Sequence, residues 1–282
     1  MLKLCMLAAV AVAIVAWAPA GAAAQHLVRP APMPPPLLEG RVTHEGARIW
    51  FETFGSGPPV ILLHGAGGDS DNFGDQVPAL IASGHRVIAI DSRAQGRSTW
   101  DGRPLNYEQM ATDVVAVMDA LSIRKAAVVG WSDGAIISLI MAMRTPERES
   151  RVFAFSPDMD PTGLAPDWMS KPLVGEAIAW AQEDYARLSP TPGDFGRVFA
   201  AIATMANTQP NYSAADLARI HGPAIAIVDG DQEELILPAH TRYLARTIPH
   251  ARLIMLKGVG HGAPIQDPDQ FNAAMIHFLD GR

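Results

Sequence analysis

The stretch Gly130-Trp131-Ser132-Asp133-Gly134 puts a serine between two apolar runs. Residues 125–130 have the length and composition of a short buried strand, and residues 135–143 have those of an apolar helix. A turn this tight brings backbone close to positions 130 and 134, where a Cβ would collide, and it exposes the serine hydroxyl. The pattern therefore predicts a nucleophilic serine at a strand-to-helix turn, with the amide of Asp133 near developing negative charge.

This stretch resembles the nucleophile elbow of the α/β-hydrolase fold, and the resemblance covers nearly everything after about residue Gly40. It implies a mostly parallel, eight-stranded α/β-hydrolase sheet with helices on both faces. It also implies a helical cap inserted after the sixth strand and catalytic residues in the order Ser, acid, His. We therefore expect one α/β-hydrolase domain over residues 40–282, with the cap at about residues 159–220.

The apolar pattern along the chain agrees with such a sheet. Residues 41–54 form two alternating runs around Glu45-Gly46, which indicates a hairpin. Short continuous apolar runs, typical of buried parallel strands, follow at residues 59–63, 85–90, 125–130, 151–155, 223–228 and 251–256. Between about residues 159 and 220 no strand is predicted, and prolines separate helical pieces.

A serine needs a base to take its proton, and the base needs a partner that holds its tautomer. His261 is the predicted base because it lies in a glycine-flanked loop straight after the last strand, the position of this residue in the family. The resemblance implies Glu233, in the turn after the seventh strand, as the acid. Asp231 remains an alternative acid, and Asp158, after the sixth strand, would serve in a minor family variant.

The loop His64-Gly65-Ala66-Gly67-Gly68 follows the strand of residues 59–63. We expect the amides of Ala66 and Asp133 to form the oxyanion hole, because the glycines let a substrate approach the main chain. A plain turn or a phosphate-binding loop is the alternative. A P-loop would need Lys-Ser or Lys-Thr after the glycines, and Asp69-Ser70 stands there instead.

Residues 91–98 resemble the D-x-R-G-x-G-x-S loop of the same family, with Ala94 where a glycine is usual. We expect Asp91 and Arg93 to pair and to hold this loop in place.

The cap of such enzymes roofs the nucleophile and shapes the acyl pocket. The predicted pocket residues are three tryptophans and a methionine, Trp131, Trp168, Trp180 and Met205. The alternative for the cap residues among them is that they only pack the cap on the main domain.

The amino terminus has the pattern of a cleaved signal peptide over residues 1–24: Lys3, an apolar core and a small-residue region. This predicts a periplasmic or secreted protein. The only cysteine, Cys5, lies in this segment, so the mature chain would have no disulfide. Residues 25–39 are rich in proline and are expected to be an extended linker outside the fold.

The 282-residue chain has a formal net charge of −7 and no Lys/Arg cluster, which argues against a nucleic-acid partner. No later apolar run has the roughly 20 residues that a stable membrane span needs. The histidines lack metal-ligand spacing, so no metal and no cofactor are expected. The oligomeric state stays open.

The expected function is a serine esterase that cleaves carboxylic ester or lactone bonds of a small or medium acyl substrate through a Ser-His-acid catalytic triad. One alternative is a C–C bond hydrolase or a perhydrolase with the same triad. Another is a ligand-binding or sensing protein that keeps the fold and turns over slowly. Dehalogenase and epoxide-hydrolase chemistry is disfavoured, because those relatives carry Asp where Ser132 stands.

Overall fold

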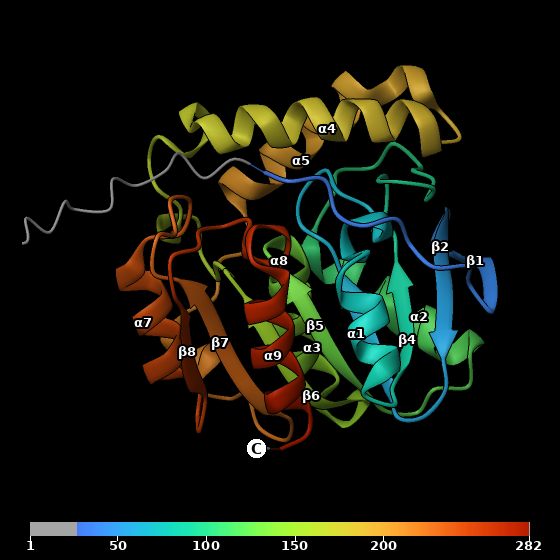
Figure 1. Cartoon of the computed structure of the whole chain (residues 1–282). Coiled ribbons are helices and arrows are strands. Elements are labelled where there is room, and N and C mark those ends of the chain that lie inside the picture. The colour runs from blue at the N-terminus through green and yellow to red at the C-terminus, as the bar shows by residue number, and fades with distance from the viewer. Residues whose placement is uncertain (1–26, 282) are drawn as a thin grey trace, which may run out of the picture.

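The computed structural model describes residues 27–281. Eight strands form one sheet in the order β1-β2-β4-β3-β5-β6-β7-β8 (Figure 1). β1 pairs with β2 and β2 with β4 in antiparallel fashion, and every other neighbouring pair is parallel. The predicted mostly parallel, eight-stranded sheet is therefore confirmed. Its strands are β1 (Leu38–His44), β2 (Ala47–Gly55), β3 (Pro59–Leu63), β4 (Arg86–Ile90), β5 (Ala126–Trp131), β6 (Glu149–Phe155), β7 (Ala224–Gly230) and β8 (Arg252–Leu256).

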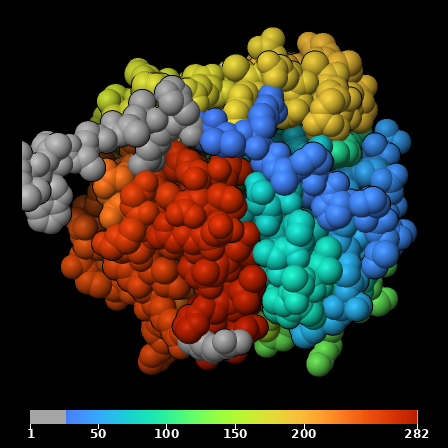
Figure 2. All heavy atoms as spheres, in the orientation of Figure 1, coloured from blue at the N-terminus to red at the C-terminus, as the bar shows by residue number. Residues whose placement is uncertain are grey.

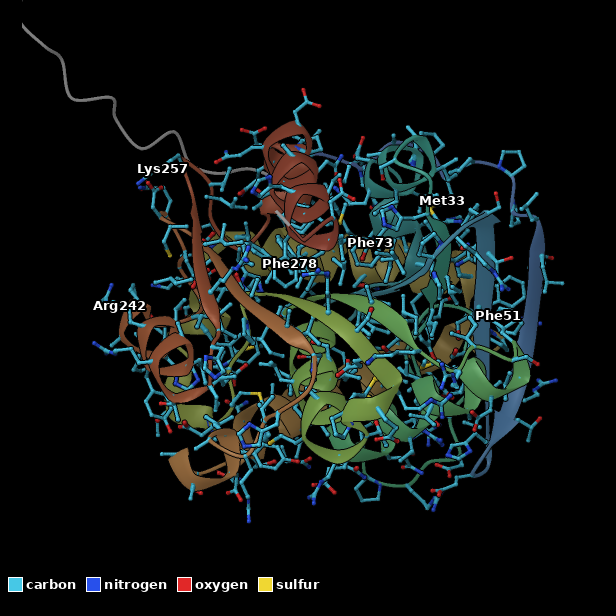
Figure 3. The ribbon with its side chains drawn as sticks, turned by 90° about the horizontal axis from the view of Figure 1, so that it is seen from below. Met33, Phe51, Phe73, Arg242, Lys257 and Phe278 are labelled. Carbon is cyan, nitrogen blue, oxygen red and sulfur yellow. The ribbon has the colours of Figure 1, made fainter. Side chains whose placement is uncertain are left out.

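Helices cover both faces of the sheet because the central strands are apolar on both sides. Successive residues of β3 alternate between the two cores: Ile61 packs in one and Leu62 in the other. The helices of the first core are α2 (Tyr107–Ala120), α3 (Asp133–Arg144) and α7 (Pro238–Thr247). Those of the second are α1 (Gln76–Ala82) and α9 (Pro268–Leu279), with Phe73 and Phe278 on this side (Figure 3).

The chain between β6 and β7 forms a helical layer above one end of the sheet (Figure 1). Its helices are α4 (Pro172–Leu188), α5 (Phe195–Thr208) and the short α6 (Ala214–Leu217). No regular strand lies in this insertion among the residues that the structure describes; Leu164 only bridges to Ile236. The helical cap after the sixth strand is thus present.

The proline-rich segment, residues 27–37, lies against the molecule between the cap and the main domain (Figure 2). The amide of Leu27 donates to Glu176 at 3.0 Å, and Arg29 binds Asp184 at 2.6 Å while its guanidinium lies over the ring of Trp180. The expectation that this segment lies outside the fold is therefore wrong. Leu27 and Arg29, just before the first of its prolines, find charged and aromatic partners on α4, and these partners cannot be seen from the local sequence.

The loop after β4 is held by ion pairs other than the expected one. Asp91 accepts from the guanidinium of Arg97 at 3.3 Å, while the buried Arg93 binds Asp113 of α2 at 2.6 Å. Ala94 has φ +70°, a left-handed conformation that favours glycine, which accounts for the glycine that relatives carry there. The loop is therefore fixed as predicted, but the pairing of Asp91 with Arg93 was wrong.

Candidate active site

Ser132 lies on the turn between β5 and α3 with φ 54° and ψ −117°, a strained conformation for a residue with a side chain. A Cβ added at Gly130 would overlap the backbone of Gly134, and one added at Gly134 would overlap the backbone of Leu63. The amide of Ser132 donates to the carbonyl of Phe155 at 2.8 Å, which ties the turn to β6. The steric reason for both glycines, predicted from the sequence, is confirmed.

His261 lies between β8 and the short helix α8 (Ala263–Gln266), and its imidazole Nδ1 is 3.0 Å from each carboxylate oxygen of Glu233. Glu233 follows β7 and is almost fully buried. Its Oε1 also accepts from the amides of Leu235 and Ile236, at 2.7 and 3.1 Å. These donors hold the carboxylate in one orientation, so the position of the imidazole is set by backbone geometry.

The electrostatics of this pair favour a charged carboxylate beside a histidine that readily accepts a proton. Burial by itself raises the pKa of Glu233, but the neighbouring His261 and the backbone donors outweigh it and lower that pKa to about 2. Burial lowers the pKa of His261, but the charge and the hydrogen bond of Glu233 outweigh it and raise that pKa. An ionised carboxylate at Nδ1 keeps a proton there and leaves Nε2 free to accept one.

The structure separates the three acids that the sequence left open. Asp231 accepts from the amide of Gly258 at 2.8 Å and lies 3.5 Å from the ammonium of Lys257, away from the imidazole. Asp158 is buried beside the pocket, and no hydrogen bond joins its carboxyl to His261 among the described residues. Glu233 is the carboxylate that the fold brings to the histidine.

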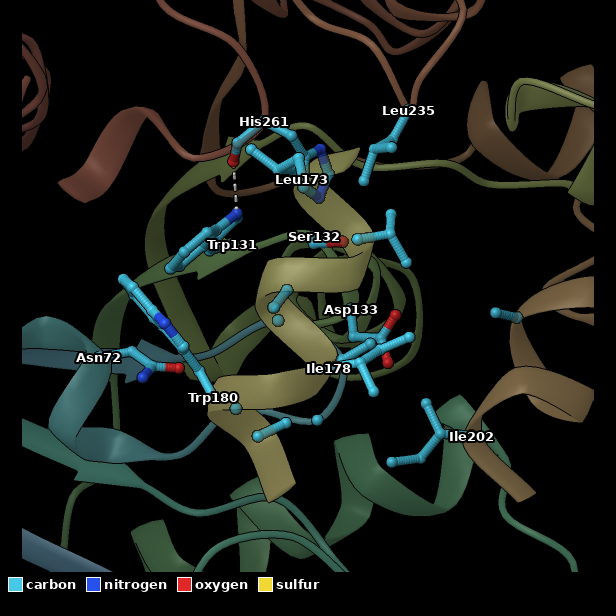
Figure 4. A pocket seen from close by; sticks show the side chains of 18 of the residues that line it. Asn72, Trp131, Ser132, Asp133, Leu173, Ile178, Trp180, Ile202, Leu235 and His261 are labelled. Carbon is cyan, nitrogen blue, oxygen red and sulfur yellow. Dashed lines mark hydrogen bonds between the residues drawn. The ribbon is translucent and has the colours of Figure 1, made fainter. Parts of the chain in front are cut away.

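Ser132 and His261 line one pocket under the cap, together with Ala66 and Asp133 (Figure 4). The indole Nε1 of Trp131 donates to the carbonyl of His261 at 2.8 Å, drawn as a dashed line in Figure 4, and so ties the histidine loop to the turn. The serine, the histidine and the residues expected to form the oxyanion hole therefore share one cavity.

The loop before the predicted oxyanion hole is rigidly held. The buried His64 bonds the carbonyl of Gly65 through Nδ1 at 2.7 Å and accepts from the amide of Ser92 at 2.9 Å. The amide of Gly68 donates back to Gly65, and that of Gly67 donates to Gln95. His64 thus shapes the loop.

The pocket wall is mostly apolar. The three predicted tryptophans, Trp131, Trp168 and Trp180, line it. Met205 is not among the lining residues: it is 1% exposed and packs in the core of the main domain. The α5 residues that line the pocket are Phe199, Ile202, Ala203 and Ala206. The sequence showed the apolar stripe of α5 but not which part of it faces the cavity.

Other lining residues were missed because no local pattern marks them. They include Leu173 and Ile178 of α4, Leu235 of the loop after β7, and Leu27 and Pro30 of the proline-rich segment. Within residues 27–281, no group of three or more His, Cys, Asp and Glu side chains could hold a metal ion. In the same range, no helix has the length and apolar character to cross a membrane. Residues 1–24, the expected signal peptide, lie outside the described residues.

Comparisons with known proteins agree with this fold. Over 83% of the chain and 95% of the relative, the chain is 27% identical to rhodomycin D methylesterase DauP of Streptomyces sp. (strain C5). It is 28% identical to a putative carbamate hydrolase, RutD, of Azorhizobium caulinodans, over 82% of the chain and 95% of the relative.

Two solved structures are also similar. One, described as Est816, an N-acyl homoserine lactone degrading enzyme, is 25% identical, with a TM-score of 0.68 over 84% of this chain and 99% of that one. The other, a meta-cleavage product hydrolase from Pseudomonas fluorescens IP01, is 21% identical with a TM-score of 0.73 over 86% and 97%, and it supports the fold alone. The model of the alpha/beta hydrolase family matches residues 60–274. With its elbow, sheet order and capped pocket, the chain belongs to the alpha/beta hydrolase family and is an enzyme of that family.

Proposed function

We propose that the protein is a serine hydrolase of carboxylic esters or lactones, with Ser132 as nucleophile, His261 as general base and Glu233 as the acid of the triad. One observation carries the proposal. The strained turn of Ser132 and the imidazole of His261 come from separate loops and line one pocket, and the imidazole lies 3.0 Å from the carboxylate of Glu233. Two of the similar proteins are named as a methylesterase and a lactone-degrading enzyme, and these names describe acyl chemistry of this kind.

In this mechanism His261 takes the proton of Ser132 through Nε2 while the serine oxygen attacks the carbonyl carbon. The amides of Ala66 and Asp133 donate to the oxyanion of the tetrahedral intermediate. The protonated imidazole gives its proton to the leaving alcohol, and an acyl-serine remains. Water, deprotonated by His261, then attacks the acyl carbonyl and releases the acid and Ser132. Glu233 stays ionised throughout and stabilises the imidazolium.

The pocket supports an acyl or alcohol group of small to medium size. Its wall combines the indoles of Trp131, Trp168 and Trp180 with aliphatic side chains from α4 and α5. Such a wall favours apolar contact with the substrate.

The test of this proposal is labelling with a fluorophosphonate, with the modified peptide identified by mass. We expect an adduct on Ser132 that disappears in Ser132→Ala and is strongly reduced in His261→Ala. Turnover of a 4-nitrophenyl ester by the same samples would fall on the order of 10⁶-fold when the nucleophile is removed. Folded wild-type protein that forms no adduct would overturn the proposal and favour a binding or sensing role.

We further propose that the enzyme acts outside the cytoplasm, in a periplasm or the medium. The support is the pattern of residues 1–24, with a positive start, an apolar core and a small-residue region. Amino-terminal sequencing of protein recovered from culture fluid or periplasm tests this. A first residue near Gln25 is expected, whereas an intact Met1 on cytoplasmic protein would contradict it.

A further inference from the structure

The ionisable side chains of the pocket are almost all acidic. Within residues 27–281, neither lysine nor arginine lines this cavity, and its titratable lining residues are Asp69, Asp133, Asp158, Asp184 and His261. Since the pocket is otherwise apolar and aromatic, an acidic group in its wall has to be explained either by a partner in the protein or by a partner in the ligand.

Two of these acids have partners in the protein. Asp184 lies 2.6 Å from the guanidinium of Arg29 and 3.0 Å from that of Arg187. Asp69 accepts from the amide of Asp71 at 2.9 Å and caps the short helix that follows it. Their presence in the wall is explained by the structure around them.

Asp133 and Asp158 differ. Asp133, 5% exposed, accepts from the hydroxyl of Tyr107 at 2.8 Å through Oδ1, while its Oδ2 is buried without a hydrogen-bond partner among residues 27–281. Asp158 is 6% exposed; its carboxyl accepts from its own backbone amide, and no hydrogen bond joins it to another residue in the described part of the chain. Figure 4 shows Asp133 in the pocket wall close to Ser132. Both residues therefore line the cavity, and both carboxyls have unused acceptor capacity.

Their environment is electrostatically incomplete. Burial raises the pKa of Asp133 to about 6, and burial together with the charge of Asp133 raises the pKa of Asp158 well above its ordinary value. The charge of Asp133 thus disfavours that of Asp158, and a protonated His261 lowers both pKa values without outweighing burial. A positive group in the pocket would stabilise both charges at once.

The aromatic wall is suited to the same kind of group. The faces of indole rings attract cations, and desolvated cation–π contacts are stronger than exposed ones. Trp131, Trp168 and Trp180 line the same cavity as the two carboxyls. Acids and indoles around one cavity are the combination by which proteins bind ammonium groups.

We propose that Asp133 and Asp158 form a cation subsite, and that the natural substrate is an ester or lactone that carries a protonated amine. This inference rests on the proposed ester hydrolysis by Ser132 and adds the substrate class. In the complex the ammonium group donates to the Asp158 carboxylate, the nearby charge of Asp133 adds to the attraction, and the alkyl part of the substrate contacts the indoles. Asp158 is a binding residue here and not the acid of the triad.

The test compares two esters with the same leaving group and acyl shape: 4-nitrophenyl 5-(dimethylamino)pentanoate and its uncharged counterpart, 4-nitrophenyl 6-methylheptanoate. Rates without enzyme correct for the intrinsic reactivity of each ester. Pairs with shorter and longer acyl chains test which length places the ammonium group in the subsite. At neutral pH we expect kcat/KM for the amine ester to exceed that for its counterpart by about tenfold or more, because a charge-assisted hydrogen bond is gained.

Two variants separate binding from catalysis. Asp158→Asn should lower the ratio of the two kcat/KM values by about tenfold. Asp184→Asn is the matched control, because this lining aspartate is already paired with two arginines. In this variant the ratio of the two kcat/KM values should change less than about twofold. An equal loss on both esters in Asp158→Asn would overturn the inference and assign Asp158 to the support of His261. A wild-type preference for the uncharged ester would also overturn it.

If neither ester is hydrolysed, either the reaction is not catalysed or the acyl chain has the wrong length to place the ammonium group in the subsite. Binding can then be tested separately. Butyldimethylammonium should then slow fluorophosphonate labelling of Ser132 in the wild type but not in Asp158→Asn. Protection that is equal in both proteins, or absent from the wild type, would contradict the cation subsite. Absence of labelling altogether would contradict the proposed function.

Discussion

Replacing Glu233 with glutamine is the sharpest test of the catalytic arrangement, since it keeps the shape of the side chain and removes its charge. The carboxylate has four close donors: His261 near both oxygens, the amides of Leu235 and Ile236 at Oε1, and Ser156 at Oε2, 2.8 Å away. Because the two amides can only donate, the glutamine oxygen has to take the Oε1 position. Its NH₂ group then takes the Oε2 position, where Nδ1 of His261 is 3.0 Å away.

This geometry sets the size of the effect. Where the NH₂ group donates to Nδ1, it favours the imidazole tautomer with the proton on Nε2, which cannot accept a proton from Ser132. The Oε1 position is also 3.0 Å from Nδ1, and where the glutamine oxygen accepts there, the productive tautomer is kept and only the charge is lost. Loss of a charge-assisted hydrogen bond alone is worth about 1.5–3 kcal/mol, or roughly 10- to 150-fold in kcat. When the acid of a serine protease triad is replaced by its amide, the wrong tautomer costs about 10⁴-fold. We expect kcat of Glu233→Gln to fall by about 10²- to 10⁴-fold.

The pH dependence gives a second readout. Activity needs neutral His261, so kcat/KM rises with pH through the pKa of this residue. Glu233 raises that pKa against the effect of burial, and without its charge the acidic limb should move to lower pH. The sign is fixed, because removing a neighbouring negative charge disfavours the imidazolium.

The assay is 4-nitrophenyl ester hydrolysis over a pH series, with circular dichroism to show that each variant is folded. Asp231→Asn is the matched control, because Asp231 pairs with Gly258 and Lys257 rather than with the histidine, and its kcat should stay within about twofold of the wild type. Glu233→Gln within tenfold of the wild type, an acidic limb that moves upward, or an equal loss in Asp231→Asn would refute the reasoning.

Two other predictions concern stability and the proline-rich segment. Glu149 is fully buried, both of its oxygens lack hydrogen-bond partners among the residues that the structure describes, and burial raises its pKa well above the ordinary value. Above the unfolded-chain pKa the unfolded state holds fewer protons at this site than the folded state, so the wild type loses stability as pH rises towards the folded pKa. The free energy of unfolding, measured with urea, should therefore be higher for Glu149→Gln than for the wild type, and the difference should be larger at about pH 8 than at about pH 5. Equal differences at the two pH values would mean that the folded protein stabilises the charged form of Glu149. Arg29→Ala removes the contacts with Glu183, Asp184 and Trp180, and should speed deuterium exchange at the amides of Leu27 and Ala31 while changing global stability by only about 1 kcal/mol. Unchanged exchange at those amides would show that Arg29 does not hold the segment.

Much of the fold could be predicted because its signals are local. The alternating and continuous apolar runs follow strand geometry, and the glycines around Ser132 follow from the room that a strand-to-helix turn leaves. Helix α2 begins after Asn106, whose side-chain oxygen accepts from the amide of Gln109, as capping rules require. These features need only a few consecutive residues.

The predictions that failed depend on residues that are distant in the chain. Asp91 and Arg93 are two residues apart, yet Asp91 binds Arg97 farther along its loop and accepts from the amide of Ser70, while Arg93 binds Asp113 of α2. Met205 shares the apolar stripe of α5 with Ile202, but the way the helix lies on the main domain buries Met205 and leaves Ile202 in the pocket wall. Arg29 meets Asp184 across 155 positions of sequence. Local patterns mark such side chains as charged or apolar without indicating their partners.

The sequence by itself determined the class of fold, the serine turn and the histidine after the last strand. Only the tertiary structure decided that Glu233, rather than Asp231 or Asp158, reaches the imidazole. Asp158 lines the same pocket as the serine, and its carboxyl is not hydrogen-bonded to any other residue in the range 27–281. The reason is that the three acids have the same chemistry, and the path of the chain after β6 and after β7 decides which one meets the histidine.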